Sequence, residues 1–338
     1  MMSSQVLRRL ILIGLMIFIA IILTAMNPVF LTAGNINKMF QEAAQIGIVA
    51  IGFSLVMITG GIDMSVGGII AMTSMVAINF ISYTNIPVVL FVPITLLVGA
   101  ITGLINGIFI AHFKLPAFIV SLATKGMLSG LALVIAVKDK LGFVQNVYIN
   151  NDIYLWFGSS TVGGIYRTAI AFLLLGMGTQ FFLKNTKAGT NIYASGANPV
   201  AATLTGINVE RTTVGVYVFG GICASIAAIF ISSRMMTAMP ELGLGMEMDV
   251  IASVVIGGTS FSGGSGDIWG TVLGSVFLAL IKNGILKLGM SPWIQPIVIG
   301  GVIIVTVIID VTQKHIAETL AAKAKLKRID AAAVDSVA

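Results

Sequence analysis

The sequence predicts an all-α, polytopic membrane protein with about ten transmembrane helices. Of its 338 residues, 57% are hydrophobic and 9% are charged, whereas a soluble domain has roughly 25% charged residues. Apolar runs recur along the whole chain, each about 17 to 25 residues long, as a helix needs to cross a bilayer. The net charge of +6 comes largely from basic residues in short loops and near the C-terminus, so we expect a lipid bilayer and no nucleic acid as partner.

Ten apolar segments fit the chain best. Their expected limits are 10–26, 39–59, 65–83, 87–111, 116–137, 164–183, 213–233, 249–263, 266–289 and 293–311. The eighth segment is short and glycines crowd its end, which indicates a broken helix because glycine weakens helices.

The distribution of positive charge indicates how these spans are oriented. With ten spans both termini lie on one side, and that side receives eleven of the nineteen Lys and Arg residues. The eleven are Arg8, Arg9, Lys114, Lys184, Lys187, Arg211, Lys314, Lys323, Lys325, Lys327 and Arg328. We therefore expect both termini in the cytoplasm. Residues 1–312 then form a transmembrane domain with a cytoplasmic loop at 184–212, and residues 313–338 form a cytoplasmic tail.

The stretch GGIDMSVGG, residues 60–68, places a carboxylate and four glycines inside an apolar region. Gly60 and Gly61 are expected to end one helix. Asp63 can cap the next helix by accepting backbone N–H groups near Ser65, a structural role that needs no solute. An ionisable residue at membrane depth also indicates a place on a solute path, so both interpretations stay open.

A second stretch, IGGTSFSGGSGDIWG at residues 256–270, again combines Gly and Ser with one carboxylate, Asp267. Four of its glycines are expected to break the helix: Gly257, Gly258, Gly263 and Gly264. Two such breaks, one in each half of the chain, indicate an internal repeat with functional sites where the repeats meet.

Other polar and small residues lie within the expected spans. The polar ones are Asn79, Asn106, Lys125 and Asn283. Each can hydrogen-bond a neighbouring helix or, if several face one cavity, contact a hydroxylated solute. Small residues at four-residue spacing predict close helix packing; these are Gly99, Gly103, Gly107, Gly270 and Gly274.

The cytoplasmic loop contains the segment ASGANPVAATLTGINVERT. Asn198 is expected to cap a short helix, Pro199 suits its first position, and Gly206 suits its end. Because a helix of about two turns is not stable alone, we expect it to rest on the ends of the spans or on a partner protein. An ordinary ordered loop is the alternative.

Several functional classes find no support in the sequence. No nucleophile–base pair or metal-ligand set indicates an enzyme, and His112 and His315 are not in metal-ligand spacing. The single cysteine, Cys223, excludes an internal disulfide. No Walker A pattern occurs, so if ATP drives this protein another chain must hydrolyse it. We expect no cofactor and no bound metal.

Taken together, these segments resemble the permease subunits of sugar ABC importers of the ribose, galactose and xylose type. GGIDMSVGG resembles that family's Gly-Gly-Ile-Asp-Leu-Ser-Val-Gly signature, and GANPVAATLTGINV resembles its cytoplasmic segment. LPAFIVSLAT, GMEMDVIASVVIGGTSFSGGSGDIWGT and GMSPWIQPIVIGGVIIVTVIID also match in order and spacing. The resemblance extends from about Asn27 to Asp310.

The resemblance implies a non-enzymatic subunit that crosses the inner (plasma) membrane of a bacterium several times. Two permease chains, identical or related, would form the path for a monosaccharide or an autoinducer-like sugar derivative. An ATP-binding subunit with a Walker A motif would dock on the cytoplasmic side, and an extracytoplasmic sugar-binding protein would deliver the solute. The short cytoplasmic helix would couple ATP hydrolysis to transport through Asn198, Pro199, Ala201, Ala202, Leu204, Gly206 and Arg211.

An ion- or proton-coupled secondary transporter is the alternative, with Asp63 or Lys125 as the coupling residue. Internal repeats and broken helices suit that class as well. The capped cytoplasmic helix favours the ABC importer, because a helix of this kind suits the docking of a separate ATPase.

Overall fold

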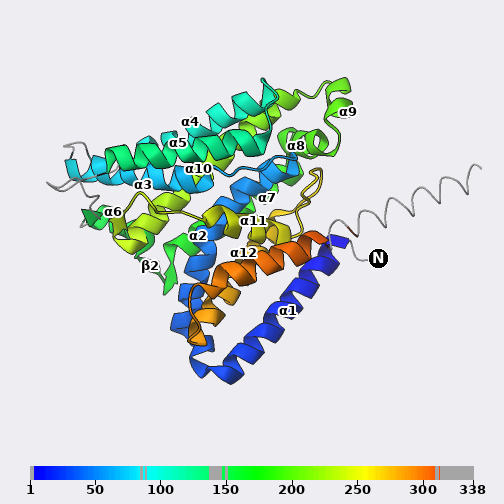
Figure 1. Ribbon diagram of the computed structural model, residues 1–338. Helices are drawn as coiled ribbons and strands as arrows, with labels where there is room; N and C mark the ends of the chain where they lie inside the picture. The colour runs from blue at the N-terminus through cyan, green and yellow to red at the C-terminus, as the bar shows by residue number, and fades with distance from the viewer. Residues whose placement is uncertain are drawn as a thin grey trace, which may run out of the picture.

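The computed structural model describes residues 4–83, 87, 90–136, 147–148, 151–308 and 312. Helices dominate this part of the chain (Figure 1), as expected where a bilayer offers the backbone no hydrogen-bond partners. The helices that correspond to the expected spans are α1 (Ser4–Met26), α2 (Ala33–Ile58), α3 (Val66–Tyr83), α4 (Phe91–Ala111), α5 (Ala117–Ile135), α7 (Arg167–Asn185), α10 (Val209–Met235), α11 (Met246–Ile256), α12 (Ile268–Lys287) and a last helix, Ile294–Ile308. The expected helical membrane architecture is confirmed, while the tail predicted at 313–338 lies outside the described residues.

Six helices in the described part of the chain are long and apolar enough to cross a membrane: α1, α2, α4, α5, α10 and α12. Two shorter apolar helices, Val66–Ile81 and Ile294–Ile308, accompany them. The internal repeat stays a prediction.

Helix α2 forms the centre of the bundle. Its most apolar 18-residue window is 94% buried, whereas that of α1 is 11% buried. Ile48, Ile51 and Val56 of α2 are fully buried and belong to the main hydrophobic core, to which α7, α10, α11 and α12 also contribute. The exposed apolar side chains of α1 suit contact with lipid, because lipid tails are as apolar as the side chains themselves.

The predicted close packing of small residues is confirmed between α4 and α10. A β-carbon on Gly99 would collide with the backbone carbonyl of Gly221, and one on Gly103 would collide with that of Tyr217. A β-carbon on Gly107 would lie 2.8 Å from Cα of Val214. The four-residue spacing therefore lets the two backbones touch along one face of each helix. On α12, Gly274 similarly faces the backbone of α11 at Ser253, and Gly270 faces that of Gly257, the residue after α11.

The eighth expected span, 249–263, is wrong in its limits. Helix α11 covers only Met246–Ile256, and residues 257–267 are not helical, since Gly258, Gly263 and Gly264 adopt left-handed backbone angles. The segment before α11 is also not a helix: after α10 the chain forms β4 (Thr237–Ala238) and then turns. The segment before α11 packs closely against Gly67 at the start of α3. A β-carbon on Gly67 would lie only 2.7 Å from the carbonyl oxygen of Gly243. Helix α11 therefore begins inside the bundle, beside the start of α3.

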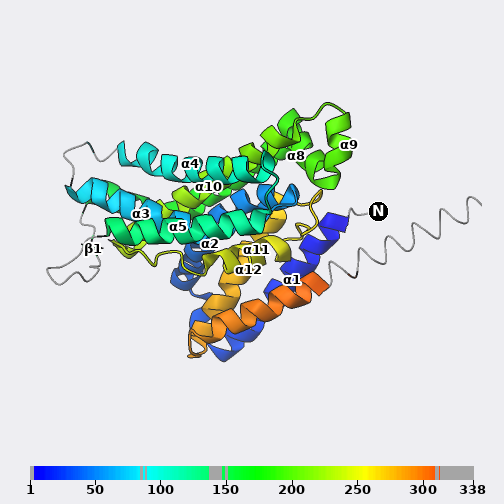
Figure 2. The same ribbon diagram turned by 45° about the horizontal axis from the view of Figure 1, so that its top comes forward.

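Short elements occupy the two ends of the bundle. The 3-10 helix Pro28–Leu31, β1 (Val147–Tyr148), α6 (Asp152–Gly158), β2 (Thr161–Val162) and β3 (Ile165–Tyr166) join the spans at one end. At the opposite end, together with the N-terminus, lie α8 (Lys187–Ala197) and α9 (Pro199–Leu204), in both views (Figures 1 and 2). Helix α8 adds a second helix to the loop in which the sequence predicted one.

Candidate functional site

Asp63 lies between α2 and α3, where the sequence predicted a helix break. It is buried, and its Oδ1 accepts hydrogen bonds from the backbone N–H of Ser65 at 2.8 Å and from its hydroxyl at 2.5 Å. Gly60 has a φ of 84°, a conformation that glycine adopts without strain, so it allows the chain to leave α2. Asp63 therefore has partners within the chain, as the capping interpretation expects.

A chain of buried hydrogen bonds continues from Asp63 into two neighbouring helices. The side-chain amide of Asn106 on α4 donates to the Ser65 hydroxyl at 3.0 Å, and the Thr124 hydroxyl on α5 donates to the Asn106 carbonyl oxygen at 2.6 Å. Ser121, one turn earlier on α5, accepts from the backbone N–H of Met64 at 3.0 Å. The α2–α3 break is thus held against α4 and α5 by polar side chains.

Lys125 follows Thr124 on α5 and pairs with a carboxylate that the sequence analysis did not single out. Its ammonium group forms an ion pair with Glu247 in the first turn of α11. Glu247 is buried, and its second oxygen, Oε2, has no hydrogen-bond partner. Sequence reasoning missed Glu247 because it lies just before the expected span, although a carboxylate that opens an apolar segment is itself a signal of function.

Asn79 and Asn283 do not join this network. The Asn79 amide donates to the backbone carbonyls of Met75 and Ile135, at 2.8 and 3.1 Å. Asn283 on α12 exchanges hydrogen bonds with Asn35 on α2, at 2.8 and 3.2 Å. Of the four polar positions, Asn106 therefore joins the hydrogen bonds around Asp63, Lys125 follows Thr124 of that network on α5 and pairs with Glu247, and the other two form separate interhelical contacts.

The two glycine-rich breaks meet each other at the end of the bundle where α8 lies. The N–H of Gly264 donates to the carbonyl of Ile58, the last residue of α2, at 2.8 Å. A β-carbon on Gly263 would lie 3.0 Å from the nitrogen of Gly60. Gly196 of α8 packs so tightly that a β-carbon there would collide with the same Ile58 carbonyl. The end of α8 therefore rests on both breaks at once.

Gly61, Gly257 and Gly258 complete the set of predicted break glycines. A β-carbon on Gly61 would approach the Tyr217 hydroxyl on α10 to 2.5 Å, and one on Gly257 would approach the Gly270 backbone to 2.5 Å. Gly258 has a φ of 89°. All three lie where the backbone turns or closely approaches a neighbouring segment, which explains why glycine occupies them.

Asp267 ends the second break and fixes it to three other parts of the chain. Its side chain caps α12 by accepting from the N–H of Gly270 at 3.0 Å. It also accepts from the Gln180 amide of α7 at 2.9 Å and forms an ion pair with Arg9 of α1. Tyr193 of α8 donates to the neighbouring carbonyl of Gly266 at 2.9 Å. Burial and the Asp267 carboxylate raise the pKa of Tyr193, so its hydroxyl remains a donor.

The predicted short helix in the cytoplasmic loop is confirmed as α9. The Asn198 side chain accepts from the N–H of Ala201 at 3.0 Å, Pro199 occupies the first position, and Gly206 follows with a φ of 86°. Ala202 is buried, whereas Leu204 is 84% exposed. Arg211 lies in the first turn of α10 and is exposed. The helix thus presents apolar side chains away from the bundle.

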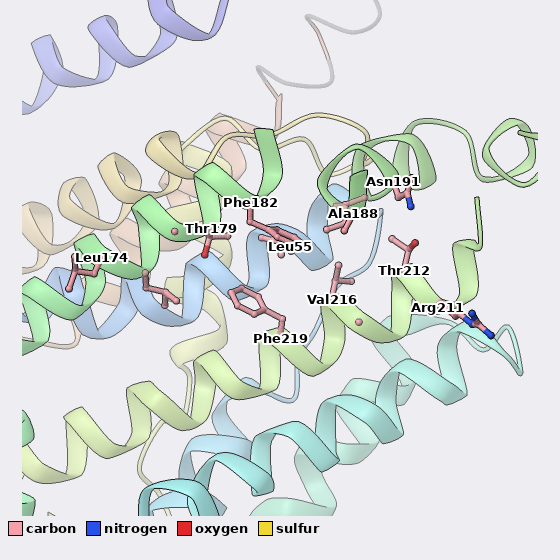
Figure 3. A pocket seen from close by; sticks show the side chains of 14 residues that line it. Leu55, Leu174, Thr179, Phe182, Ala188, Asn191, Arg211, Thr212, Val216 and Phe219 are labelled. Atoms are coloured by element: carbon pink, nitrogen blue, oxygen red, sulfur yellow. The ribbon is translucent and has the colours of Figure 1, made fainter. Parts of the chain in front are cut away.

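An apolar cavity of about 610 Å³ lies among α2, α7, α8 and α10 (Figure 3). Its lining is mainly apolar and includes Leu174, Phe182, Val216 and Phe219, and Arg211 lies at one end beside Thr212 (Figure 3). Four polar side chains, Thr179, Asn191, Arg211 and Thr212, also line it.

Comparisons of the sequence with known proteins place the chain in a family. The family model described as "Branched-chain amino acid transport system / permease component" matches residues 35–307. No solved structure matches the chain.

Individual relatives match almost the whole chain. The "Ribose import permease protein RbsC" of Escherichia coli (strain K12) is 35% identical over 301 residues, which cover 88% of this chain and 92% of the relative. The "D-allose transport system permease protein AlsC" of the same strain is 32% identical over 296 residues, with 88% and 89% covered. The "Fructose import permease protein FruG" of Bifidobacterium longum (strain NCC 2705) is 33% identical over 312 residues, with 88% of each chain covered.

Proposed function

The chain belongs to the family of permease components of branched-chain amino acid transport systems, and we propose that it is the membrane subunit of an ABC importer for a monosaccharide. Relatives named for ribose, D-allose and fructose each match over 88% of its length, which supports a sugar of this size. As a permease it forms the path of the solute, and a separate subunit hydrolyses ATP.

The proposed topology has ten membrane segments with both termini in the cytoplasm of a bacterium. The segments are the six long apolar helices together with α3, α7, α11 and the helix Ile294–Ile308. Lys184, Lys187 and Arg211 lie at the end of the bundle that carries α8 and α9. The positive-inside rule therefore supports a cytoplasmic location for that end and for the N-terminus beside it.

The exposed apolar face of α9 is the observation that carries the proposal. Val200 is 71% exposed and Leu204 is 84% exposed, on a helix of only six residues. Apolar side chains exposed together favour a protein contact. We infer that α9 is the coupling helix, with Asn198, Pro199, Ala201, Ala202, Leu204, Gly206 and Arg211 as its contact and support residues.

A movement of α9 would reach the solute path through α8. The C-terminal end of α8 rests on the end of α2 and on the second glycine break, through Gly196 and Gly264. The break between α2 and α3 begins directly after this end of α2 and contains Asp63. Hydrogen bonds through Ser65 connect Asp63 to Asn106 on α4 and, through Asn106, to Thr124 on α5. This contiguous set of contacts supports a coupled displacement of the break when the ATPase closes.

The proposed partners follow from this function. They are an ATP-binding subunit with a Walker A motif, an extracytoplasmic sugar-binding protein and a second permease chain, either identical or related. The test is uptake of labelled ribose, allose and fructose into proteoliposomes that contain the complete complex. We expect uptake of at least one of them with enclosed ATP and none with enclosed ADP; uptake of none with ATP would contradict the proposal.

A secondary transporter remains the second candidate, because the buried Lys125–Glu247 pair is the kind of intramembrane charge that such a protein uses. Proteoliposomes prepared with the complete complex and with the chain alone separate the two. Uptake that requires a proton or sodium gradient, and proceeds without ATP and without a partner ATPase, would favour the secondary transporter.

The role of Asp63 is tested by replacing it with asparagine. If Asp63 acts as a cap, Asp63→Asn keeps an acceptor for Ser65, and we expect uptake within about twofold of the unmodified protein. Asp63→Ala removes the acceptor and should lower stability by about 1–3 kcal/mol, measured by thermal unfolding of the purified protein. A well-folded Asp63→Asn protein without uptake would show instead that the carboxylate charge serves transport.

A further inference from the structure

A cavity of about 330 Å³ lies among α2, α11, α12 and the segment before α11. Five polar side chains from four helices line it: Glu42 and Gln45 of α2, Asp249 of α11, Lys282 of α12 and Gln295 of the last helix. Pockets for small molecules hold about 300–1,000 Å³, so this volume fits a ligand at the small end of that range. The hydrogen-bonded network around Asp63 does not use these residues.

The charges around this cavity cancel in pairs. Lys282 donates to Asp249 at 2.5 Å, and Arg234, which lies beside the cavity, donates to Glu42 at 3.2 Å. Two cations and two carboxylates leave no net charge for an ion to neutralise. Each carboxylate can still accept further hydrogen bonds. Such a wall suits a neutral ligand with several hydroxyl groups.

Gln45 supplies a buried donor without a partner. Its carbonyl oxygen accepts from Arg234 at 3.0 Å, an assignment that is fixed because a guanidinium only donates. Its Nε2 is buried and has no hydrogen-bond partner. An unpaired buried donor is costly, and a sugar oxygen in the cavity would satisfy it.

The rest of the wall is apolar. Ile46, Ile231 and Ala279 lie between the polar groups. A monosaccharide has C–H groups between its hydroxyls, so it presents both kinds of surface to such a wall. An inorganic ion or a purely apolar ligand would leave one part of the wall without a suitable contact.

The cavity lies in the half of the bundle opposite α9. Lys282 is five residues before the end of α12, which at 1.5 Å per residue is roughly 7–8 Å. That end of α12 lies beside the end of α1, since the Asn27 amide donates to the Lys287 carbonyl at 2.6 Å. With α9 in the cytoplasm, the cavity belongs to the outer half of the membrane.

We propose that this cavity binds the monosaccharide during its passage along the path that the permease chains form. Gln45 donates to a sugar oxygen, and Asp249 and Lys282 bond hydroxyl groups from the facing side. The ligand class rests on the proposed function, whereas the site rests on the geometry of these side chains.

Protection of an introduced cysteine tests the site directly. Cys223, the single cysteine of the chain, is buried, so Leu286→Cys introduces a reactive thiol at a half-exposed position on the cavity wall. The variant is labelled with a small water-soluble thiol reagent in the complete complex in nanodiscs, with and without the sugar that the complex takes up. We expect labelling to slow about tenfold at a sugar concentration near ten times its dissociation constant.

Two glutamines on α2 give a matched pair of variants. Gln45→Leu in the Leu286→Cys background should raise the sugar concentration for half-maximal protection about tenfold, the effect of losing about 1.4 kcal/mol of binding. Gln41→Leu should leave it unchanged, because Gln41 lies one turn earlier and bonds the Gly158 carbonyl at 2.7 Å outside the cavity.

The outcomes separate this inference from the proposed function. Absence of protection, or equal protection in the two glutamine variants, while the complex still imports the sugar with ATP, would overturn the inference alone. If the complex imports none of the tested monosaccharides, the proposed function fails and the inference fails with it.

Discussion

Replacing Leu204 by Asp is expected to lower sugar-stimulated ATP hydrolysis and ATP-driven uptake strongly, while the chain still inserts and folds. Leu204 is 84% exposed at the end of α9, so little of its surface contacts its own chain. A charge at this position would be buried against the partner ATPase without a counter-charge. Central apolar residues of an interface contribute about 2 kcal/mol or more, so we expect uptake to fall at least tenfold, measured in the reconstituted complex.

Two control variants show whether the effect is specific. Leu204→Met keeps an apolar side chain of similar volume and should retain most of the uptake. Val162→Asp introduces the same charge at an exposed apolar position of β2, at the opposite end of the bundle, and should not affect coupling. Normal coupling in the Leu204→Asp protein would show that α9 is not the ATPase contact.

Replacing Lys125 by Met is expected to cause the largest loss of stability. It leaves Glu247, which is buried, as an uncompensated charge between α5 and α11. Breaking a buried ion pair by removing one partner costs about 3–5 kcal/mol. We therefore expect a large drop in folded yield and in the unfolding temperature of the purified protein, measured by size-exclusion chromatography and thermal unfolding.

A double-mutant cycle isolates the contribution of the pair. Adding Glu247→Gln to Lys125→Met removes the unpaired charge and should recover most of the lost stability, because neutral pairs of similar volume are tolerated at such sites. If the double variant is as unstable as Lys125→Met, the cost arises from packing rather than from the ion pair.

Local signals explain what could be predicted from the sequence. The limits of α2, α3, α4 and α12 agree with the expected spans within a few residues, apart from an earlier start of α2, because apolar runs of membrane length are unambiguous. Helix α9 follows from Asn198 and Pro199, whose capping chemistry acts within one helical turn. The glycine spacing on α4 likewise identified its packing face.

Distant contacts explain what could not be predicted. The partners Lys125 and Glu247 are 122 residues apart in the chain, so nothing in the local pattern joins them. Helix α8 has low intrinsic helix preference, with glycines at 189 and 196, and it is supported where Gly196 packs on the end of α2. Helix α11 both begins and ends earlier than the expected span, because the chain enters and leaves it through left-handed glycines, Gly245 and Gly258, which a hydrophobicity pattern does not register.

The central claim is that this chain transports a monosaccharide as the permease of an ABC importer, and its partners test that claim most directly. The measurement is mass spectrometry of the proteins that co-purify with the chain from native membranes in mild detergent. We predict a stoichiometric subunit with a Walker A motif, which the Leu204→Asp variant no longer retains. A chain that purifies stably and repeatedly without such a subunit, and transports in response to an ion gradient, would contradict the account.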